Sequence, residues 1–271
     1  MRNEQLNLEG LQDIEAYVDY FNQYTNSFLK LSEPGDHNCL LKKKHCLRVM
    51  ELARKLAHSE GFDKRLQFLV SLAALFHDLG RFEQYIRYKT FNDRLSVNHA
   101  RLGVRILHSR RALYSLSDRD RKIICLAILY HNRRSLPAAL NHDLNLISRA
   151  VRDADKLDIF PIIITSVSKD TEESNKITLN LENRNMISPQ ILGQIKSGKM
   201  ADYNLMRYKN DFLLLLASWV YDLNYASSFA RIINAGYVRT IFKMLPRNRE
   251  MRDLENKLLV HLEKRVAGQN G

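Results

Sequence analysis

Apolar residues recur every three or four positions along most of this 271-residue chain, and alternation with a period of two is scarce. Such spacing places the apolar side chains on one face of an α-helix. Only five prolines and ten glycines interrupt the pattern, which therefore predicts long helices. In the first 160 residues the predicted helices cover 14–29, 40–57, 64–79, 98–109, 117–132 and 143–160.

Particular residues mark the expected ends of these helices. Gly80 is expected to end the third helix and Pro161 the sixth, since glycine and proline commonly follow a last helical turn. Ser117 is followed three residues later by Asp120, which resembles a capping box. The boundaries are therefore predicted from turn chemistry as well as from the apolar spacing.

After Pro161 the regular helical spacing of apolar residues is interrupted by a polar segment. Residues 166–176 are polar and predict a loop, and residues 177–181 suit either a short strand or part of that loop. Residues 188–198 predict a capped helix, with Ser at the N-cap and Pro in the first turn. Residues 203–266 predict two or three further helices.

The pattern as a whole predicts an all-α fold. We expect a helical core over residues 1–160, and a helical extension over 161–271 that packs on the core within the same domain. The length is sufficient for a sizeable hydrophobic core, and 45% hydrophobic with 27% charged residues is ordinary for a globular protein.

Charge points to anionic partners. The formal net charge is +12, which favours a small phosphorylated molecule, such as a nucleotide, over nucleic acid. Only the charge supports nucleic acid, because no zinc finger and no strand platform of aromatic and basic residues accompanies it.

The cysteine content and the hydropathy of the chain exclude further classes of protein. The three cysteines, Cys39, Cys46 and Cys125, form no CxxC pair, so neither a disulfide framework nor a thiolate zinc site is expected. The first residues lack a signal-peptide pattern, and the longest strongly apolar run, 212–221, is too short to span a bilayer. We expect a cytoplasmic protein without membrane association.

Six ionisable side chains lie on or next to the apolar faces. His45, for example, lies four residues before Val49 and seven before Leu52, so it shares their inward stripe. A buried carboxylate costs several kcal/mol unless it is paired or coordinated. Metal ions satisfy imidazole and carboxylate together, and these ligands suit Zn, Mn, Fe and Co. The six residues are His45, His77, Asp78, His99, His131 and Asp155.

The order of these residues resembles a known signature. His45, the pair His77-Asp78, and Asp155 resemble the H…HD…D pattern of the HD-domain superfamily. His99 and His131 match the two extra histidines of its binuclear branch. The resemblance covers roughly residues 40–160 and implies an all-helical, metal-dependent phosphohydrolase fold.

The resemblance also implies a ligand set for two divalent metal ions (Mn, Fe, Co, Ni, Zn or Mg). One metal would be held by His45, His77, Asp78 and Asp155, and the second by Asp78, His99 and His131. Asp78 would bridge the metals, since one carboxylate has two oxygens. A hydroxide shared by the two metals would then attack phosphorus.

A phosphate group needs further cations, and basic residues follow several predicted ligands. Arg81 and Lys156 are the first candidates, because they neighbour Asp78 and Asp155. The predicted catalytic residues are Asp78, Asp155, Arg81 and Lys156. The predicted substrate-binding residues are Arg81, Lys89, Arg94, Asn98, Arg133, Arg134 and Lys156.

Two assignments stay open at this point. Lys42, Lys43 and Lys44 precede His45, but three successive residues span most of a helical turn, so not all can face the site. Asp158 lies three residues after Asp155, on nearly the same face, and is a second candidate for its role.

Three functions are compatible with this ligand set. The first is a metal-dependent phosphohydrolase or phosphodiesterase acting on a nucleotide or other small phosphate ester. The second is a di-iron oxygenase, because the inositol and phosphonate-cleaving oxygenases resemble HD domains with the same ligands. The third is a non-catalytic binding module whose metals hold the helices together. We favour the first.

Overall fold

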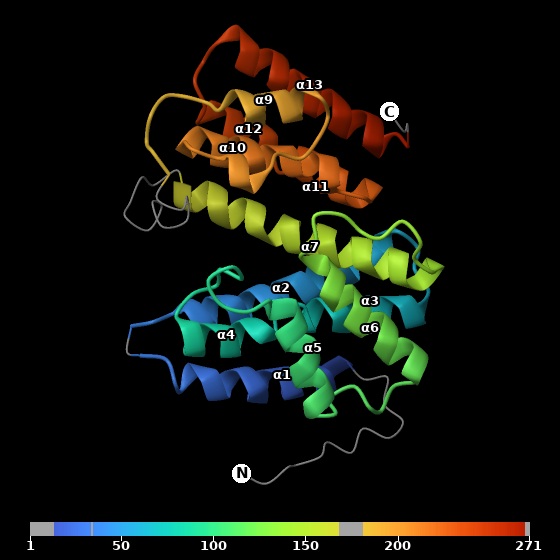
Figure 1. Cartoon of the computed structure of the whole chain (residues 1–271). Coiled ribbons are helices and arrows are strands. Elements are labelled where there is room, and N and C mark those ends of the chain that lie inside the picture. The colour runs from blue at the N-terminus through green and yellow to red at the C-terminus, as the bar shows by residue number, and fades with distance from the viewer. Residues whose placement is uncertain (1–13, 34, 168–180, 269–271) are drawn as a thin grey trace. The chain divides into compact units, whose positions relative to one another are not determined.

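Figure 1 shows the computed structural model of the chain, which describes residues 14–33, 35–167 and 181–268. In these residues every regular element is a helix, apart from one isolated bridge between Glu182 and Tyr208. The predicted all-α fold is therefore confirmed. The chain divides into two compact units, Met1–Asp155 and Lys156–Gly271, which are described separately.

Helix α3 lies at the centre of the first unit. It packs against α1, α2 and α6, and α2 runs beside it (Figure 1). Its last residues, from Leu72 to Phe76, have no exposed surface and belong to the hydrophobic core. The helices of the unit are α1 (Ile14–Leu29), α2 (Asn38–Ser59), α3 (Lys64–Phe76), α4 (Gly80–Tyr88), α5 (His99–Ser109), α6 (Asp118–His131) and the first part of α7 (His142–Val167).

The predicted end of α3 is wrong. The helix begins at Lys64 as predicted, where the carboxylate of Asp63 accepts a hydrogen bond from the Leu66 amide. It ends at Phe76, and Gly80 opens α4 instead of stopping α3. Gly80 does not have the left-handed backbone of a helix-ending glycine.

Gly80 has a packing role instead. A Cβ atom on Gly80 would lie 2.1 Å from the carbonyl oxygen of His99 and 2.7 Å from the amide nitrogen of Gly103. A Cβ on Gly103 would in turn lie 3.2 Å from the amide nitrogen of Gly80. Only glycine lets α4 and α5 approach this closely.

Helix α4 is absent from the sequence-based prediction, which leaves residues 80–88 outside any helix. The signal is present but short, because Phe82, Tyr85 and Ile86 are spaced by three and four positions. Phe82 is fully buried against Phe21 of α1. Tertiary packing of this apolar face stabilises a helix of only nine residues.

The second unit begins within α7, which continues past Pro161 to Val167. The predicted stop at Pro161 is therefore wrong. Proline removes one backbone hydrogen bond and crowds the preceding turn, but burial on both sides of it offsets this loss. Phe160 stacks on Tyr237 with ring centroids 5.5 Å apart, and Ile164 is also buried.

The helix after the polar segment follows the sequence-based expectation, but residues 203–266 form four α-helices and two short 3-10 helices where two or three helices were predicted. The helix predicted at 188–198 is α9, which has Ser188 at its N-cap and Pro189 as its first residue. The predicted loop and possible strand at 166–181 fall largely in 168–180, outside the described residues. After α7 come α9 (Pro189–Lys196), η1 (Tyr203–Leu205), α10 (Lys209–Ser218), η2 (Trp219–Asp222), α11 (Ala226–Asn234), α12 (Tyr237–Lys243) and α13 (Arg249–Val266).

None of the helices in the described parts of the chain combines the length and the apolar character that crossing a membrane requires.

Candidate metal centre

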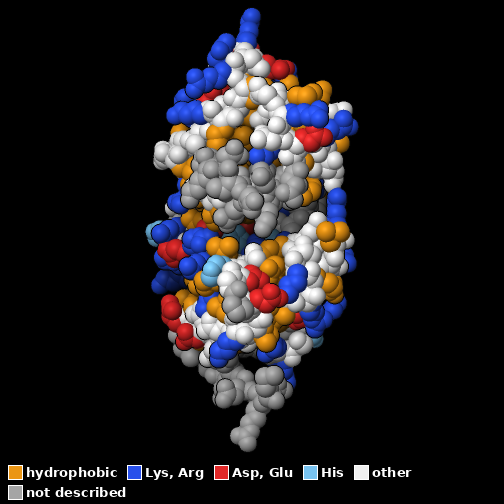
Figure 2. All heavy atoms as spheres, turned by 90° about the vertical axis from the view of Figure 1, so that its left-hand side faces the viewer, with side chains coloured by type: hydrophobic (Ala, Val, Ile, Leu, Met, Phe, Trp, Pro, Cys, Tyr) orange, Lys and Arg blue, Asp and Glu red, His pale blue; other side chains and the backbone are white. Residues whose placement is uncertain are grey.

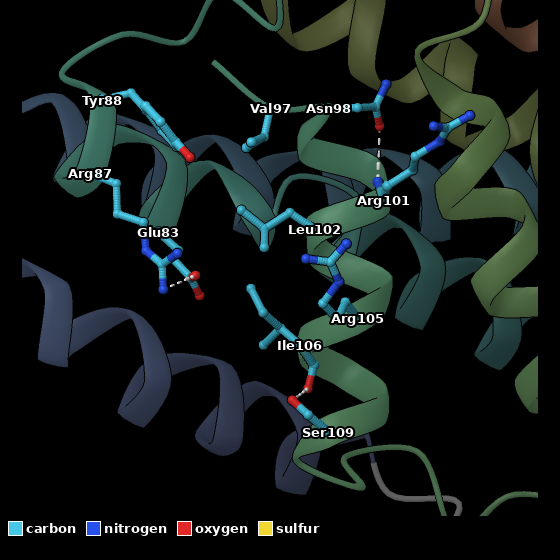
Figure 3. A pocket seen from close by; sticks show the side chains of 10 residues that line it. All are labelled: Glu83, Arg87, Tyr88, Val97, Asn98, Arg101, Leu102, Arg105, Ile106 and Ser109. Atoms are coloured by element: carbon cyan, nitrogen blue, oxygen red, sulfur yellow. Dashed lines mark hydrogen bonds and ion pairs between the residues drawn. The ribbon is translucent and has the colours of Figure 1, made fainter.

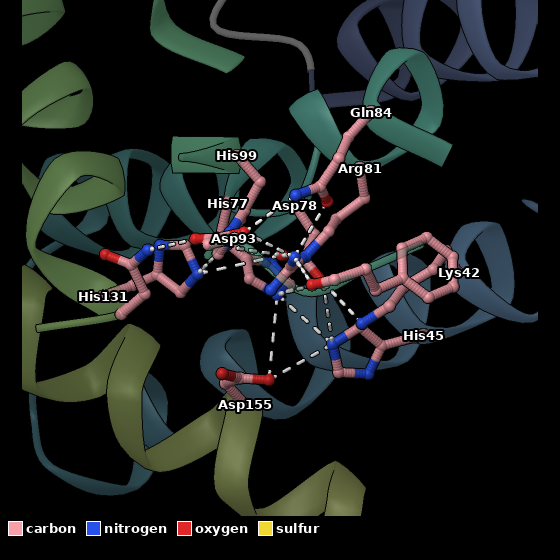
Figure 4. A network of polar contacts seen from close by, with 12 residues as sticks. Lys42, His45, His77, Asp78, Arg81, Gln84, Asp93, His99, His131 and Asp155 are labelled. Atoms are coloured by element: carbon pink, nitrogen blue, oxygen red, sulfur yellow. Dashed lines mark hydrogen bonds and ion pairs between the residues drawn. The ribbon is translucent and has the colours of Figure 1, made fainter. Parts of the chain in front are cut away.

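The six side chains singled out in the sequence lie together in the first unit (Figure 4). They come from α2, the turn after α3, the first residue of α5, the last residue of α6, and α7. Their nitrogen and oxygen atoms form three groups, within each of which the atoms lie no more than 4.8 Å apart. These groups are His45-His77-Asp78, His77-His131-Asp155 and Asp78-His99-His131.

Two of the histidines are fixed in the same way at the ends of helices. Nδ1 of His77 donates a hydrogen bond to the carbonyl of Ala74, and Nδ1 of His131 donates one to the carbonyl of Ile128, both at 2.7 Å. The last carbonyls of a helix have no partner within the helix. Each imidazole satisfies one of them and thereby turns its Nε2 toward the cluster.

The carboxylate of Asp78 lies between two pairs of histidines. Its Oδ2 is 3.7 Å from Nε2 of His45 and 3.7 Å from Nε2 of His77. Its Oδ1 is 3.2 Å from Nε2 of His99 and 3.8 Å from Nε2 of His131. Each oxygen therefore faces a different pair of imidazole nitrogens.

The donor set fits metal ions because it brings lone pairs together. His77, His99 and His131 each carry a proton on Nδ1, since that atom faces a carbonyl or carboxylate oxygen. In the neutral rings Nε2 then holds a lone pair. Nε2 of His99 is nevertheless 3.1 Å from Nε2 of His131 and 3.2 Å from Oδ1 of Asp78. A cation among these atoms turns the repulsion into coordination.

Protonation of the histidines would also remove this repulsion, but burial disfavours the charged imidazolium form of His77 and His131. Burial lowers the pKa of His77, and it lowers the pKa of His131 to about 3, with the neighbouring His77 and His99 adding to the effect. Burial alone would raise the pKa of Asp78, but Lys42 and the surrounding cationic groups hold it well below its usual value. The favoured state thus pairs the charged Asp78 carboxylate with neutral imidazoles of His77 and His131, as metal binding requires.

Asp93 holds the His99 ring by a hydrogen bond from Nδ1, the ring nitrogen that does not face Asp78. Its Oδ2 accepts a hydrogen bond from Nδ1 of His99 at 2.7 Å, and its Oδ1 lies 2.8 Å from Nη1 of Arg81 and 2.9 Å from Nε2 of Gln84. Burial raises the pKa of Asp93, but the hydrogen bond and charge of His99, with Arg81, lower it to about 2. A carboxylate behind a histidine fixes its tautomer and ring orientation in metal sites.

Two cations border the cluster. Nζ of Lys42 is 2.8 Å from Oδ2 of Asp78, and Nε of Arg81 is 3.4 Å from Oδ1. The ring of Phe91 lies under both, 5.5 Å from Nζ of Lys42. Of the lysine triplet, Lys42 therefore reaches the cluster, whereas Lys43 donates to Asn26.

Arg81 reaches the cluster as predicted, but from within a helix and with several partners. Besides Asp78 and Asp93, its guanidinium donates to Gln84 at 2.9 Å and to the carbonyl of Phe91. Only 16% of its side chain is exposed. Arg81 therefore links α4 to the loop that precedes α5.

Arg152 holds the end of α6. It is buried on α7 and donates to the carbonyls of Tyr130 at 3.3 Å, His131 at 3.2 Å, Arg133, and Arg134 at 3.4 Å. These carbonyls come at a helix end, where partners are otherwise scarce. Arg152 thus anchors the backbone that carries the His131 side chain.

Several predicted substrate-binding residues have other contacts. Lys89 is half exposed and pairs with Glu33 at 3.1 Å. Asn98 caps α5 by accepting a hydrogen bond from the Arg101 amide at 2.9 Å. Arg94 is exposed on the loop before α5. The structure does not bring these three side chains into the cluster, and their binding roles stay predictions.

The residues after His131 and after Asp155 also lie outside the three ligand groups. Arg133 and Arg134 are exposed, and the guanidinium of Arg133 lies over the ring of Tyr130 at 4.7 Å. Lys156 pairs with Asp222 at 2.7 Å within the second unit.

The structure brings Asp155, and not Asp158, into the ligand groups found among the described residues. Oδ1 of Asp155 is 3.2 Å from Nε2 of His45 and 3.8 Å from Nε2 of His77. Asp158 belongs to the second unit and is absent from the ligand groups found among the described residues.

Sequence reasoning missed Asp93, Gln84 and Arg152. Arg152 lies three residues before Asp155, so its face on the helix was a usable signal. Helical spacing gave no signal for Asp93 and Gln84, because their roles depend on the loop before α5 folding back over α4.

The fold and the cluster define a helical protein with a buried histidine–aspartate centre whose donors suit divalent metals. Residues 43–159 match the HD domain family, so this protein carries an HD domain, which is typical of metal-dependent phosphohydrolases. The predicted resemblance to the HD-domain superfamily is confirmed over these residues, and the binuclear ligand set stays a prediction. No curated protein and no solved structure matches the chain.

Proposed function

We propose that this protein is a metal-dependent phosphohydrolase or phosphodiesterase that acts on a nucleotide or another small phosphate ester. The observation that carries the proposal is the position of Asp78, whose two oxygens face different histidine pairs at 3.2–3.8 Å. A carboxylate placed in this way suits a bridge between two metals.

Each side of Asp78 offers a separate set of ligands. His45, His77 and Asp155 would complete one metal site, and His99 with His131 would complete the other. Divalent ions bound there would supply Lewis acidity, which activates water and neutralises charge on a phosphoryl group.

The chain itself supplies the positive charge and the orientation that a phosphate needs. Lys42 and Arg81 lie beside Asp78 and are 24% and 16% exposed, so both can contact a ligand that enters the centre. Asp93 keeps Nδ1 of His99 protonated and its Nε2 free for coordination. Asp155, at 22% exposure, can accept a hydrogen bond from an entering water.

The distribution of charge favours a small substrate over nucleic acid. On the face shown in Figure 2, basic side chains alternate with acidic and apolar ones. A protein that follows a phosphate backbone needs a continuous basic stripe. The mixed charges on this face and the net charge of +12 therefore support attraction of small anions.

The proposal can be tested by metal analysis and an activity screen on the full chain. Protein purified without added metal should contain about two divalent ions per chain, and it should release phosphate from phosphomonoesters or cleave phosphodiesters equally under air and argon. Asp78→Asn should abolish activity and lower the metal content. Asp118→Asn, at a carboxylate that is 94% exposed, should change neither.

Other outcomes would overturn the proposal. One metal per chain would contradict a binuclear centre. Two irons with oxygen consumption and a mixed-valence signal would assign the centre to a di-iron oxygenase. Normal metal content, with no turnover of phosphate esters or oxygen, would leave the metals with a structural role.

A further inference from the structure

A cavity of about 520 Å³ lies between α4 and α5 in the first unit (Figure 3). Val97, Leu102 and Ile106 form its apolar part. None of the cluster's predicted metal ligands lines it. The volume suits a small molecule, since ligand pockets commonly measure about 300–1,000 Å³.

The charged side chains around the cavity are mostly basic. Arg87, Arg101 and Arg105 line it, and Glu83 is the only acidic residue among the lining residues. Arg87 is already engaged, because its guanidinium lies 2.7 Å from Glu83. A positive excess therefore remains beside the apolar wall.

Arg105 is the cation best placed for a ligand. It projects from α5 between Leu102 and Ile106 (Figure 3). No ion pair engages Arg105 among the residues that the structure describes. A guanidinium presents a planar array of donors that matches phosphate oxygens.

An aromatic side chain lies at the edge of the same cavity. Tyr88, the last residue of α4, lines it and is 44% exposed. An exposed ring next to an apolar wall offers a stacking surface for a planar group. The cavity thus combines a phosphate-binding cation with a place for an aromatic body.

A buried hydroxyl nearby lacks a hydrogen-bond partner. Tyr24 of α1 is 6% exposed, and no hydrogen bond to its OH is formed by the described residues. Burial is the main cause that raises the pKa of Tyr24; the charge of Glu83 raises the pKa further, whereas Arg110 and Arg87 lower it.

From these features we infer that the α4–α5 cavity is a second ligand site, which binds a small organic phosphate with an aromatic body. Arg105 holds the phosphate, and the wall of Val97, Leu102 and Tyr88 holds the ring. The inference is independent of the proposed phosphohydrolase activity. It concerns a site that none of the predicted metal ligands lines.

The test measures binding by calorimetry to the full chain treated with a chelator, so that turnover does not interfere. The probes are AMP and phenyl phosphate, with adenosine and inorganic phosphate as their separate halves. We expect a saturable complex with AMP or phenyl phosphate, and binding of each half at least about tenfold weaker. The complex should also raise the melting temperature of the protein.

Variants assign the binding to the cavity. Arg105→Glu should weaken the complex at least about tenfold, and Arg105→Lys should weaken it less. Arg252→Glu, at an exposed arginine of α13, should leave it unchanged. Lys42→Ala should also leave it unchanged, because Lys42 borders the metal centre.

The inference is overturned by either of two results. One is the absence of saturable binding of both AMP and phenyl phosphate at millimolar concentration. The other is binding that Lys42→Ala abolishes and Arg105→Glu does not, which would place the probe at the metal centre. Metal content measured on Arg105→Glu should equal that of the wild type, so failure here does not affect the proposed function.

Discussion

Asp93 and His99 form a hydrogen-bonded pair in which Nδ1 of the imidazole donates to Oδ2 of the carboxylate at 2.7 Å. The pair joins a residue from the loop before α5 to the first residue of that helix. It sets the tautomer of His99, so that Nε2 faces Asp78 at 3.2 Å with a lone pair. The orientation of one predicted metal ligand thus depends on a residue outside the HD motif.

Removing the charge of Asp93 should weaken metal binding. Asp93→Asn loses the ionic hydrogen bond to His99 and the pairing with Arg81. We expect the affinity of the more weakly bound metal to fall about 10–100-fold, as for other outer carboxylates. Titration of the metal-free protein against a chelating indicator measures this. Asp118→Asn is the control, and an equal affinity in both variants would contradict the role of Asp93.

The contact of α4 with α5 should not tolerate a methyl group. Gly80→Ala places Cβ 2.1 Å from the His99 carbonyl, which is backbone and cannot turn aside. We expect a loss of about 1–3 kcal/mol in the free energy of unfolding, measured by urea denaturation. The matched control is Gly193→Ala in α9, where nothing lies within 4 Å. It should stabilise by about 0.5–1 kcal/mol, and equal effects would contradict the packing argument.

Loss of the Arg152 hydrogen bonds to the end of α6 should lower both the stability and the metal content of the protein. Arg152→Ala leaves the carbonyls of Tyr130 and His131 without this donor. Buried unsatisfied groups cost about 1–3 kcal/mol, and release of the helix end should also lower metal occupancy. Arg149→Ala, at an exposed position of the same helix, should change neither. If Arg152→Ala were destabilised but kept a normal metal content, Arg152 would contribute to stability only and not to metal binding.

An ion pair at the start of α7 should make stability depend on acid pH. The hydrogen bond from Arg65, 2.9 Å away, is the main cause that lowers the pKa of Asp143 from its usual 3.8. A lowered pKa adds stability that is fully present above pH 3.8 and is lost as the pH falls through the lowered value.

Asp143→Asn should therefore reduce the free energy of unfolding by about 0.5–1 kcal/mol at pH 7, because the pair is partly exposed. The difference from the wild type should shrink as the pH falls below 3.8. Urea denaturation at several pH values measures this, and a difference that stays constant into strong acid would refute the assignment.

The helical spacing of apolar residues was enough to predict the fold class and most helix positions. Periodicity is a local property, so the starts of α1 and α3 could be read from a few adjacent residues. Local turn chemistry was less reliable at Gly80 and Pro161. There the outcome depended on His99 and on Tyr237, which lie far away along the chain.

The sequence by itself determined which residues could form the centre. His45, His77, Asp78, His99, His131 and Asp155 are polar residues on or beside inward faces, and a core accepts such residues only when they satisfy one another. The helical period therefore pointed to them before any contact was known.

Only the tertiary structure decided how the centre is supported. Asp93 behind His99, Arg152 on the end of α6 and Lys42 on Asp78 are contacts between separate segments. No spacing rule encodes such contacts, because they depend on the angles and distances at which helices pack. The same packing made Gly80 the point where α4 meets α5, instead of the end of a helix.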